Sequence, residues 1–232
     1  MSTYISNAES YARESLMITH PDSSYYLKQT IHPSVTSRAK RSMDIIGAIV
    51  GLVITALVCI PIAIATLLSD RDPLFYSQIR CGLNGKTFRI WKFRSMVVNA
   101  DKLKHLVKNE ASGHIFKCTH DPRITPVGRI LRQTSLDELP QFWNVLKGEM
   151  SLVGTRPPTL DEVQQYQPHH WERLQVKPGI TGQWQANGRS TIKDFEKIVS
   201  MDIEYQRNWS PVYDLMLIFK TILVVVKKSG AC

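Results

Sequence analysis

The chain has 232 residues, 43% of them hydrophobic, and carries 29 Lys and Arg against 20 Asp and Glu, a formal net charge of +9. This length suits one sizeable hydrophobic core, although two small domains would also fit. The charge favours an anionic partner such as a phospholipid surface, a nucleotide or nucleic acid. Its four cysteines lie far apart without a CxxC pair, which argues against a zinc site or a disulfide framework and favours a reducing compartment.

The N-terminal part divides into a polar stretch and an apolar one. Residues 1–37 are rich in Ser, Thr and Tyr and lack the features of a secretory signal, so we interpret them as a poorly ordered extension. Ile45–Leu68 then gives 24 residues without Asp, Glu, Lys or Arg. At ~1.5 Å per residue such a helix is about 36 Å long and exceeds a bilayer core of about 30 Å. We therefore expect a membrane helix within residues 38–72.

The path of this helix depends on Pro61, which lies two-thirds of the way along the apolar run. Proline removes a backbone donor and usually bends a helix, and a bend here would turn the chain back. The segment has four Lys and Arg on its N-terminal flank and three on the other, so the positive-inside rule gives no orientation. Both a re-entrant helix with two cytosolic ends and a straight or kinked span fit this pattern.

The region after the membrane segment predicts a small β-hairpin. Leu74–Ile79 and Thr87–Phe93 have the composition of two strands, and Asn84-Gly85 supplies a turn between them. Asp101–Lys108 is expected to form a charged helix, and two X-Pro pairs beyond it mark a loop. The chain contains no Walker-type P-loop and no Rossmann glycine fingerprint.

Two adjacent carboxylates, Asp137 and Glu138, precede an apolar helical run in the segment SLDELPQFWNVLKGEM. Ser135 and Glu138 match a capping box, whereas Pro140 favours a helix that begins at the proline itself. Either start places both acids at the positive end of a helix, where amides favour ionised acids and bound phosphate. We expect the helix to end at Gly148. Plain capping and a favourable first-turn charge explain the acids equally well.

Several cations are candidates for an anionic ligand. Arg156 precedes Pro157 and Pro158, which restrict the backbone and hold a guanidinium fork suited to a diphosphate or a nucleobase edge. Arg132 lies five residues before Asp137 and could serve the same anion. The glycine-bearing turns could close over a ligand, which adds Arg189 of the turn NGR. A surface arginine is the ordinary alternative for Arg132, and the turn that contains Arg189 needs no function. Lys92 and Arg94, near the end of the second strand, are on local sequence mainly expected to be exposed strand cations.

The C-terminal segment predicts one more helix. Ser210-Pro211 forms a good cap and first position, and the apolar run Leu215–Val226 is broken only by Lys220. Twelve residues are too few to span a bilayer as a helix. An interfacial helix ending in two lysines and a core helix of the soluble part fit the pattern equally well.

Taken together, these motifs resemble the bacterial sugar transferases, also called monotopic phosphoglycosyl transferases or polyprenyl-phosphate hexose-1-phosphate transferases. The resemblance covers nearly everything from Lys40 onward and is carried by KRSMDIIGAIVGL, PLFYSQIRCGLNGKTFRIWKFRSM, DPRITPVGRILRQTSLDELPQFWNVLKGEMSLVG, RPP, KPGITGQWQANGR and DIEYQRNWSPVYDL. It implies transfer of a sugar 1-phosphate from a nucleotide diphosphate sugar, usually UDP-hexose, to membrane polyprenyl (undecaprenyl) phosphate. UMP would be released, and the product would start an exopolysaccharide, capsule or related glycan.

The resemblance also implies an α+β, helix-rich fold and a set of residue roles. A single compact catalytic domain, 73–232, would follow the re-entrant helix and contain the small β-hairpin and interfacial amphipathic helices. Asp137 matches the nucleophile that forms a phosphosugar-aspartyl intermediate, and Glu138 matches the ligand of Mg2+. The candidate substrate contacts are Lys92, Arg94, Arg132, Arg156, Pro157 and Arg189, and the candidate supporting acids are Asp202 and Asp214. The family usually has Pro-Arg-Pro where this chain has Thr155-Arg156-Pro157. It usually has a Ser-Pro pair where this chain has Ile60-Pro61.

Such proteins sit in the bacterial plasma (inner) membrane with the catalytic domain on the cytoplasmic face. The partners implied are a nucleotide diphosphate sugar, polyprenyl phosphate and the lipid bilayer; no nucleic acid is expected, and a homo-oligomer is allowed. Two other classes explain part of the sequence. A membrane-anchored basic adaptor would account for the charge and the apolar helix, and an ordinary glycosyl transferase would release UDP instead of UMP.

Overall fold

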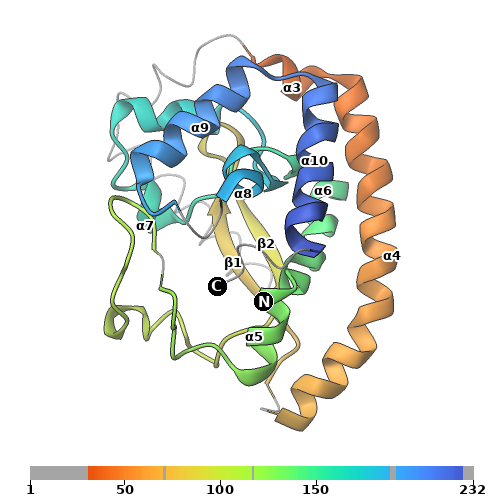
Figure 1. Ribbon diagram of the computed structural model, residues 1–232, viewed down its shortest axis with the longest axis vertical. Coiled ribbons are helices and arrows are strands. Elements are labelled where there is room, and N and C mark those ends of the chain that lie inside the picture. The colour runs from red at the N-terminus through yellow and green to blue at the C-terminus, as the bar shows by residue number, and fades with distance from the viewer. Residues whose placement is uncertain (1–30, 70–71, 117, 189–191, 227–232) are drawn as a thin grey trace, which may run out of the picture.

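The computed structural model describes residues 31–69, 72–116, 118–188 and 192–226. A long helix, α4 (Arg38–Ser69), runs along one side of the molecule, and the hairpin of β1 (Phe75–Cys81) and β2 (Thr87–Phe93) stands near the centre (Figure 1). A second, parallel pair joins β3 (Ser151–Val153) to β4 (Gly179–Thr181). The remaining helices are α3 (Pro33–Thr36), α5 (Pro126–Gln133), α6 (Phe142–Lys147), α7 (Leu160–Val163), α8 (Gln183–Gly188), α9 (Phe195–Arg207) and α10 (Pro211–Val226).

The prediction of a helix-rich fold with one long apolar helix and a small hairpin is confirmed. Residues 1–30 of the predicted N-terminal extension lie outside the described residues, and the part that follows contains the short helix α3. Cys59, Cys81 and Cys118 are free thiols, as the sequence indicated.

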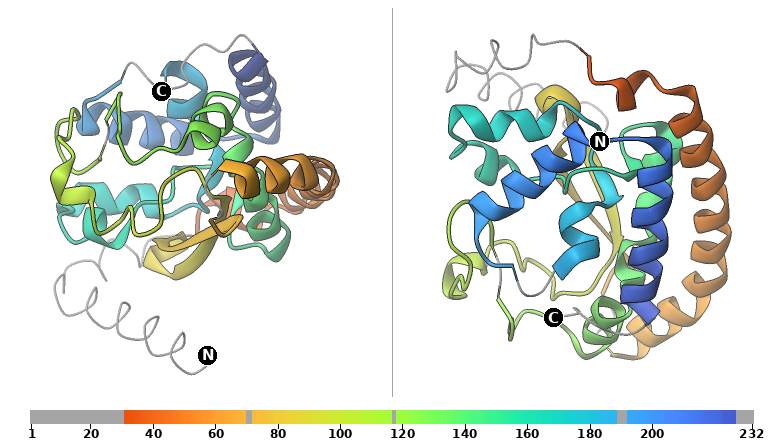
Figure 2. Two further views of the ribbon diagram at one scale, coloured as in Figure 1. Left: turned by 90° about the horizontal axis from the view of Figure 1, so that it is seen from below. Right: turned by 45° about the horizontal axis from the view of Figure 1, so that its top comes forward.

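Helix α4 packs against the rest of the protein along its whole length. It contacts α6, α5, β3 and the 3-10 turn η3 (Leu136–Gln141). A Cβ atom at Gly51 would lie 2.3 Å from the ring of Phe142, so glycine is required for this close approach. The helix stays continuous through Pro61, and its last part bends toward α5 (Figures 1 and 2). Its buried positions form one stripe: Lys40, Asp44, Ala48, Gly51, Thr55, Ile62 and Thr66.

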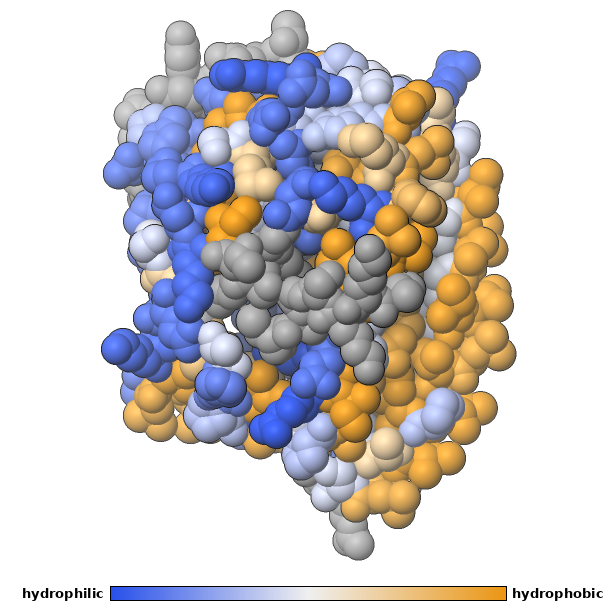
Figure 3. Space-filling view, in the orientation of Figure 1, coloured by the Kyte–Doolittle hydropathy of each residue, from blue (hydrophilic) through white to orange (hydrophobic). Residues whose placement is uncertain are grey.

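The opposite face of α4 is apolar and exposed. In Figure 3 its hydrophobic side chains form a band along one edge of the molecule, while hydrophilic side chains gather on the other side. Of the helices that the structure describes, α4 alone is long and apolar enough to cross a membrane. Its exposed large side chains are Ile45, Ile46, Ile49, Val50, Val53, Ile54, Leu57, Ile60, Ile64, Leu67 and Leu68.

The first turns of α4 are held by buried polar contacts. Lys40 Nζ lies 2.6 Å from Asp214 Oδ2 at the start of α10 and donates a hydrogen bond to Val153 O at 2.9 Å. The guanidinium of Arg41 donates to two carbonyls at the C-terminal end of α6, and Asp44 accepts hydrogen bonds from the start of β3. The helix is therefore built into the rest of the protein and is not a detachable anchor.

The hairpin forms as predicted, with β2 at the predicted residues and β1 shifted toward its C-terminal end. Asn84 and Gly85 both have positive φ values, 53° and 73°, which a tight turn between antiparallel strands requires. The predicted helix at Asp101–Lys108 is wrong, because only Lys104–Leu106 form a short 3-10 turn there. This segment has no apolar stripe to bury, and its charged side chains bond to other segments instead.

The carboxylate segment starts differently from either prediction. Ser135 adopts a left-handed conformation, φ 56°, and its side chain makes no capping bond, so the predicted capping box is wrong. Asp137 and Glu138 lie in the 3-10 turn η3, and regular α-helix begins only at Phe142, after Pro140. Gly148 ends α6 in a left-handed conformation, φ 82°, as predicted. The acids therefore precede the helix instead of occupying its first turn.

Helix α10 begins at the predicted Ser210-Pro211 pair, with Ser210 Oγ accepting the amide of Tyr213 at 3.1 Å. One face of the helix packs into the core through Leu217, together with Val153, Ala186 and Tyr205. The other face leaves large apolar side chains exposed, namely Val212, Leu215, Met216, Phe219, Ile222 and Leu223. The helix is thus half core and half exposed apolar surface.

Candidate active site

A cavity of about 350 Å3 opens between the hairpin, η3, α5 and the segment after β3. Charged side chains of both signs line it. The acids are Asp101, Asp121, Asp137, Glu138 and Glu162. The cations are Arg80, Lys92, Arg94, Lys104, Arg123, Arg132 and Arg156. Both members of the acid pair thus meet four of the predicted substrate contacts in one place, namely Lys92, Arg94, Arg132 and Arg156.

Lys92 and Glu138 form the centre of this arrangement. Lys92 Nζ lies 3.0 Å from Glu138 Oε1, and both side chains are mostly buried. The strand and the acid segment are joined through Asn144, which is fully buried and donates to Arg89 O at 2.7 Å. Its own carbonyl oxygen accepts the amide of Trp91 at 3.2 Å. The amide of Asn144 therefore fixes the register in which Lys92 meets Glu138.

Asp137 lies beside this pair and is 5% exposed. It belongs to a 3-10 turn whose backbone is fixed by Pro140 and by the packing of Leu139 against α4. A carboxylate held at the wall of a cationic cavity is ready to meet an anionic ligand at short range, because the surrounding cations offset the charge repulsion. This is the environment expected for a nucleophile directed at a phosphate.

Arg132 reaches the cavity from α5. Its Nε donates to Ser95 Oγ at 3.0 Å, next to the end of β2. Helix α5 approaches this backbone closely, since a Cβ atom at Gly128 would lie 2.0 Å from Ser95 O. Thr125 caps the helix by accepting the Gly128 amide at 3.0 Å. The close contact sets the depth at which Arg132 enters the cavity.

Arg156 follows β3, and Thr155 before it replaces the usual proline. Thr155 is buried, and its hydroxyl donates to Arg173 O at 3.1 Å. Its backbone carbonyl oxygen accepts the Gly179 amide at 2.8 Å. Hydrogen bonds therefore supply the rigidity that a proline ring would give. Arg156 Nη1 lies 3.5 Å from Glu162 Oε1. Burial opposes the ionisation of Glu162, but Arg156 and Arg80 together hold its pKa below the ordinary value.

The sequence analysis missed several residues of the cavity wall. Arg80 ends up against the segment after β3, where its Nη1 donates to Pro157 O at 3.0 Å. Burial lowers the pKa of Arg80 to about 10, and the nearby Arg156 adds to this effect. Glu162 and Trp184 also line the cavity. The only local sequence signal for Glu162 was the Thr159 capping box, which the structure shows to be formed.

The remaining predicted substrate contacts divide into three outcomes. Arg94 lines the cavity, but its guanidinium also donates to Pro73 O at 2.7 Å and so holds the start of the hairpin. Pro157 lines a smaller pocket next to the main cavity. Arg189 lies outside the described residues.

Asp202 and Asp214 do not line the cavity. Asp202 accepts two hydrogen bonds from the guanidinium of Arg173, at 2.9 and 2.6 Å, in the protein interior. Asp214 is paired with Lys40 and also accepts from Tyr205 and Trp209. Both acids hold helices together, and neither is placed to touch a ligand in the cavity.

Magnesium was expected at Glu138, and the residues present fit a hard cation. Mg2+ prefers oxygen ligands and usually takes one or two carboxylates together with substrate phosphates. Asp137 and Glu138 supply two neighbouring carboxylates in a cavity whose other cations suit phosphate. Glu138 already attracts a positive charge, that of Lys92 at 3.0 Å.

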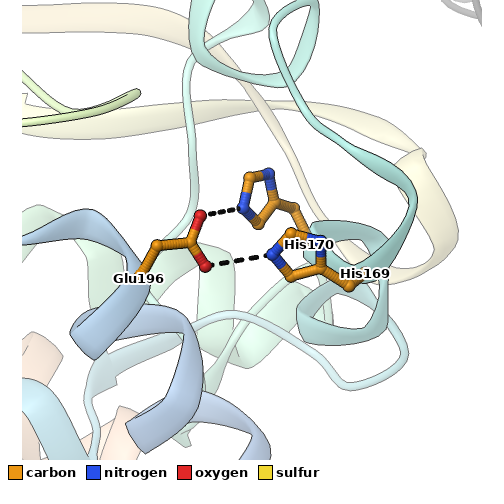
Figure 4. A group of neighbouring side chains, drawn as sticks. All are labelled: His169, His170 and Glu196. Atoms are coloured by element: carbon orange, nitrogen blue, oxygen red, sulfur yellow. Dashed lines mark hydrogen bonds and ion pairs between the residues drawn. The ribbon is translucent and has the colours of Figure 1, made fainter.

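A second group of ligand-type residues lies elsewhere, on η4 (Pro168–Leu174) and α9 (Figure 4). Glu196 accepts hydrogen bonds from His169 Nε2 at 3.0 Å and His170 Nε2 at 2.7 Å. His170 Nδ1 accepts the Gln167 amide at 2.9 Å, so the proton of the neutral ring sits on Nε2. That nitrogen has no lone pair for a metal, and the cluster is a structural hydrogen-bond network.

Comparison with known proteins identifies the family. The family model described as bacterial sugar transferase matches residues 35–228, which is most of the chain. The chain belongs to the bacterial sugar transferase family. The match begins just before α4 and extends through α10, so it includes both the apolar helix and every described residue of the cavity.

Three relatives illustrate the similarity. The chain is 50% identical over 195 residues to "Galactosyl transferase CpsE" of Streptococcus agalactiae serotype III, covering 83% of this chain and 43% of that protein. It is 43% identical to "Undecaprenyl-phosphate galactose phosphotransferase" of Salmonella typhimurium, covering 83% and 41%. It is 38% identical to "Exopolysaccharide production protein ExoY" of Rhizobium meliloti, covering 83% and 88%. The chain thus spans less than half the length of the first two relatives and most of the third.

Proposed function

We propose that this protein transfers a sugar 1-phosphate from a UDP-sugar to undecaprenyl phosphate and releases UMP. The observation that carries the proposal is the meeting of Asp137 and Glu138 with Lys92, Arg132 and Arg156 in one cavity. The names of several relatives describe transfer of galactose or glucose phosphate to undecaprenyl phosphate, which supports the same substrates. The relative named for exopolysaccharide production supports a role in surface glycan synthesis.

In the first half-reaction, a carboxylate oxygen of Asp137 attacks the phosphorus that bears the sugar. The bond between this phosphorus and the bridging oxygen breaks, and UMP leaves with the electron pair. Lys92, Arg132 and Arg156 neutralise the diphosphate and so reduce its repulsion of the incoming carboxylate. A covalent phosphosugar-aspartyl intermediate divides one transfer between two bulky anions into two steps.

In the second half-reaction, a phosphate oxygen of undecaprenyl phosphate attacks the same phosphorus. The bond to Asp137 breaks, the carboxylate is restored, and the sugar now rests on a lipid diphosphate. No proton transfer is needed in either step, because phosphate groups both attack and leave as anions. Glu138 and Asp137 would hold Mg2+, which supplies further positive charge to the bound phosphates.

We propose that the catalytic domain lies on the cytoplasmic face of the plasma membrane, with both ends of α4 on that side. The domain packs on α4 from Lys40 to Thr66. If α4 crossed the bilayer upright, the charged domain beside it would enter the hydrocarbon at considerable cost. This cost is avoided if the exposed apolar face of α4 dips into the bilayer while both ends of the helix stay at the same membrane surface. The exposed apolar face of α10 supports the same placement.

The position of the charged side chains favours an enzyme over a basic adaptor. An adaptor needs surface charge, whereas here the acid pair and its cations face a cavity of about 350 Å3.

The test of the reaction is the identity of the nucleotide product. Protein in undecaprenyl phosphate-containing vesicles, given UDP-glucose or UDP-galactose, should release UMP only when Asp137 is intact. Acceptor-dependent release of UDP would instead identify an ordinary glycosyl transferase.

The membrane placement has a separate test. In a chain without its native cysteines, cysteines introduced at Ile31 and Lys102, both exposed, should both be shielded from a membrane-impermeant maleimide in intact cells. Both should react once the cells are opened. If one of the two positions reacts in intact cells, α4 spans the bilayer.

A further inference from the structure

Three buried polar atoms without a protein partner belong to residues that line one small pocket beside the cavity. In the part of the chain that the structure describes, only four buried side-chain nitrogen or oxygen atoms lack a hydrogen bond. One is Thr66 Oγ1 in α4; the other three are Arg80 Nε, Trp184 Nε1 and Gln185 Oε1. An unmet buried polar group costs about 1–3 kcal/mol, so three of them in one place indicate a missing partner.

All three residues line one pocket of about 40 Å3, which adjoins the main cavity. Arg80 and Trp184 line both spaces, whereas Gln185 lines only the small pocket. Lys92, Glu138 and Arg156 border both spaces as well. The small pocket is therefore directly next to the place where the proposed function puts the reacting phosphate. It has room for a group of one or two heavy atoms and excludes a nucleobase.

The chemistry of the three atoms selects the missing partner. Arg80 Nε and Trp184 Nε1 are donors, whereas Gln185 Oε1 is an acceptor. A phosphate oxygen would satisfy the two donors but would place negative charge against the Gln185 oxygen. A hydroxyl group accepts from a donor and donates to an acceptor at once. Among the groups of the proposed donor, a hydroxyl matches all three atoms, and the sugar carries its hydroxyls next to the reacting phosphate.

We propose that Arg80, Trp184 and Gln185 form a hydroxyl-recognition subsite that selects among sugars. This inference rests on the proposed function and adds the residues that distinguish one UDP-hexose from another. The surrounding fold is suited to the task, because Trp184 is 5% exposed and packs in the core cluster with Val163, Leu174 and Ile198. A rigid donor can discriminate between hydroxyl positions, since a misplaced or missing hydroxyl leaves buried groups unmet.

The test compares a UDP-hexose with its monodeoxy analogues. For each, kcat/KM is measured from UMP release by the full chain in undecaprenyl phosphate-containing vesicles. The hexose used is whichever the wild-type protein uses best. The informative quantity is the ratio of the parent value to a deoxy value within one preparation, because the amount of active protein cancels. This ratio stays interpretable even in a variant that folds poorly.

We expect the wild-type ratio to be about tenfold at one hydroxyl position, the factor that one net hydrogen bond gives. Gln185→Met keeps the length of the side chain but removes the acceptor, and it should lower the ratio at that position. Trp184→Phe should lower the same ratio. Gln165→Met, the same change at an exposed glutamine, should leave it unaltered.

Two failures are distinguishable. If the wild type releases UMP but Gln185→Met and Trp184→Phe lose activity equally with the parent and every deoxy analogue, the subsite is wrong and the proposed function stands. Such a result would mean that the pocket holds an ordered water and supports the fold only. If the wild type releases UDP, or no nucleotide from any UDP-sugar, the proposed function and the subsite both fall.

Discussion

Two pairs of acids in this protein carry the same carboxylate group in opposite surroundings. Asp137 and Glu138 line a cavity in the company of cations from separate parts of the chain. Asp202 and Asp214 are buried in closed networks, where Arg173 and Lys40 approach them to 2.6 Å. The sequence motifs make all four acids candidate site residues, the first pair as catalytic and the second as supporting acids, but only the first pair lines the cavity.

The difference shows what separates a reactive carboxylate from a structural one. A carboxylate whose oxygens are all taken by fixed donors has no position left for a phosphorus atom or a metal ion, and removing its charge leaves a buried cation unpaired. Substitution of a carboxylate in a cavity wall costs the protein little stability, but it removes the reactive group. Substitutions in the first pair should therefore reduce activity, whereas substitutions in the second pair should reduce stability.

The largest effect is expected for Asp137→Asn. The amide is nearly the same size but a far poorer nucleophile, so we expect turnover to fall by at least about 10⁴-fold, as for other nucleophile removals. The wild type, given UDP-sugar and Mg2+ without acceptor, should release about one UMP per site and retain a phosphosugar on the peptide that contains Asp137. The variant should do neither.

The control for this prediction is thermal unfolding, which should be nearly unchanged in Asp137→Asn. An adduct that maps to Glu138 would show that Glu138, and not Asp137, is the nucleophile. Normal turnover in the variant would remove Asp137 from the reaction altogether.

The next effect concerns stability. Asp214→Asn leaves the buried ammonium of Lys40 without its counter-charge, and we expect a loss of about 3–5 kcal/mol in the free energy of unfolding. Glu110→Gln provides the matched control, because its partner Lys193 is exposed and the pair lies at 2.9 Å on the surface. Solvent screens an exposed pair, so the loss in this variant should be small. Equal losses in both variants, by denaturant titration, would contradict the closed network.

Part of this contrast could be predicted from sequence. The strands, the Ser210 cap and the Gly148 stop depend on local chemistry, so the pattern of residues predicted them. The 3-10 turn at Asp137 was not predicted, because Ser135 adopts a left-handed conformation that only the packing of η3 against α4 and β2 explains. Local patterns describe single elements, but they carry no information about such contacts.

The cavity illustrates the same limit. The sequence motifs identified Lys92, Arg132 and Arg156 as candidates, and the fold brings them together. Arg80 and Gln185 have no distinguishing pattern, and their role depends on which atoms lack a partner after folding. Conversely, Asp202 and Asp214 matched a motif, and only the structure reveals that Arg173 and Lys40 bind them in the protein interior, away from the cavity.

A third, smaller effect is expected at Arg156, which tests whether the cavity reads geometry as well as charge. Arg156→Ala should lower kcat/KM for the UDP-sugar about 100-fold, while Arg156→Lys, which keeps the charge but loses the planar fork, should lower it about 10-fold. Membrane association, measured by vesicle flotation, should be unchanged in both variants. An alanine variant with wild-type efficiency would remove Arg156 from the substrate site.

The smallest effect is a pH dependence of stability from His170, which belongs to a structural network as Asp214 does. Burial lowers the pKa of His170 despite its hydrogen bond to Glu196. As the pH falls below ~6.5, the unfolded chain therefore binds a proton at this position at a higher pH than the folded chain does. The free energy of unfolding must decrease as the pH falls through that value. Above pH ~6.5 both states are neutral there, and the slope from this group vanishes.

Denaturant titration between pH 5 and 7.5 checks this expectation in a range above that in which Glu196 becomes protonated, because the hydrogen bonds from His169 and His170 lower the pKa of that acid. His170→Gln removes the titrating ring, so its stability should decline less steeply on acidification than that of the wild type. His169→Gln, at the half-exposed neighbour on the same carboxylate, is the matched control and should keep the wild-type slope. If His170→Gln keeps the wild-type slope, the buried ring is not the group whose protonation destabilises the fold.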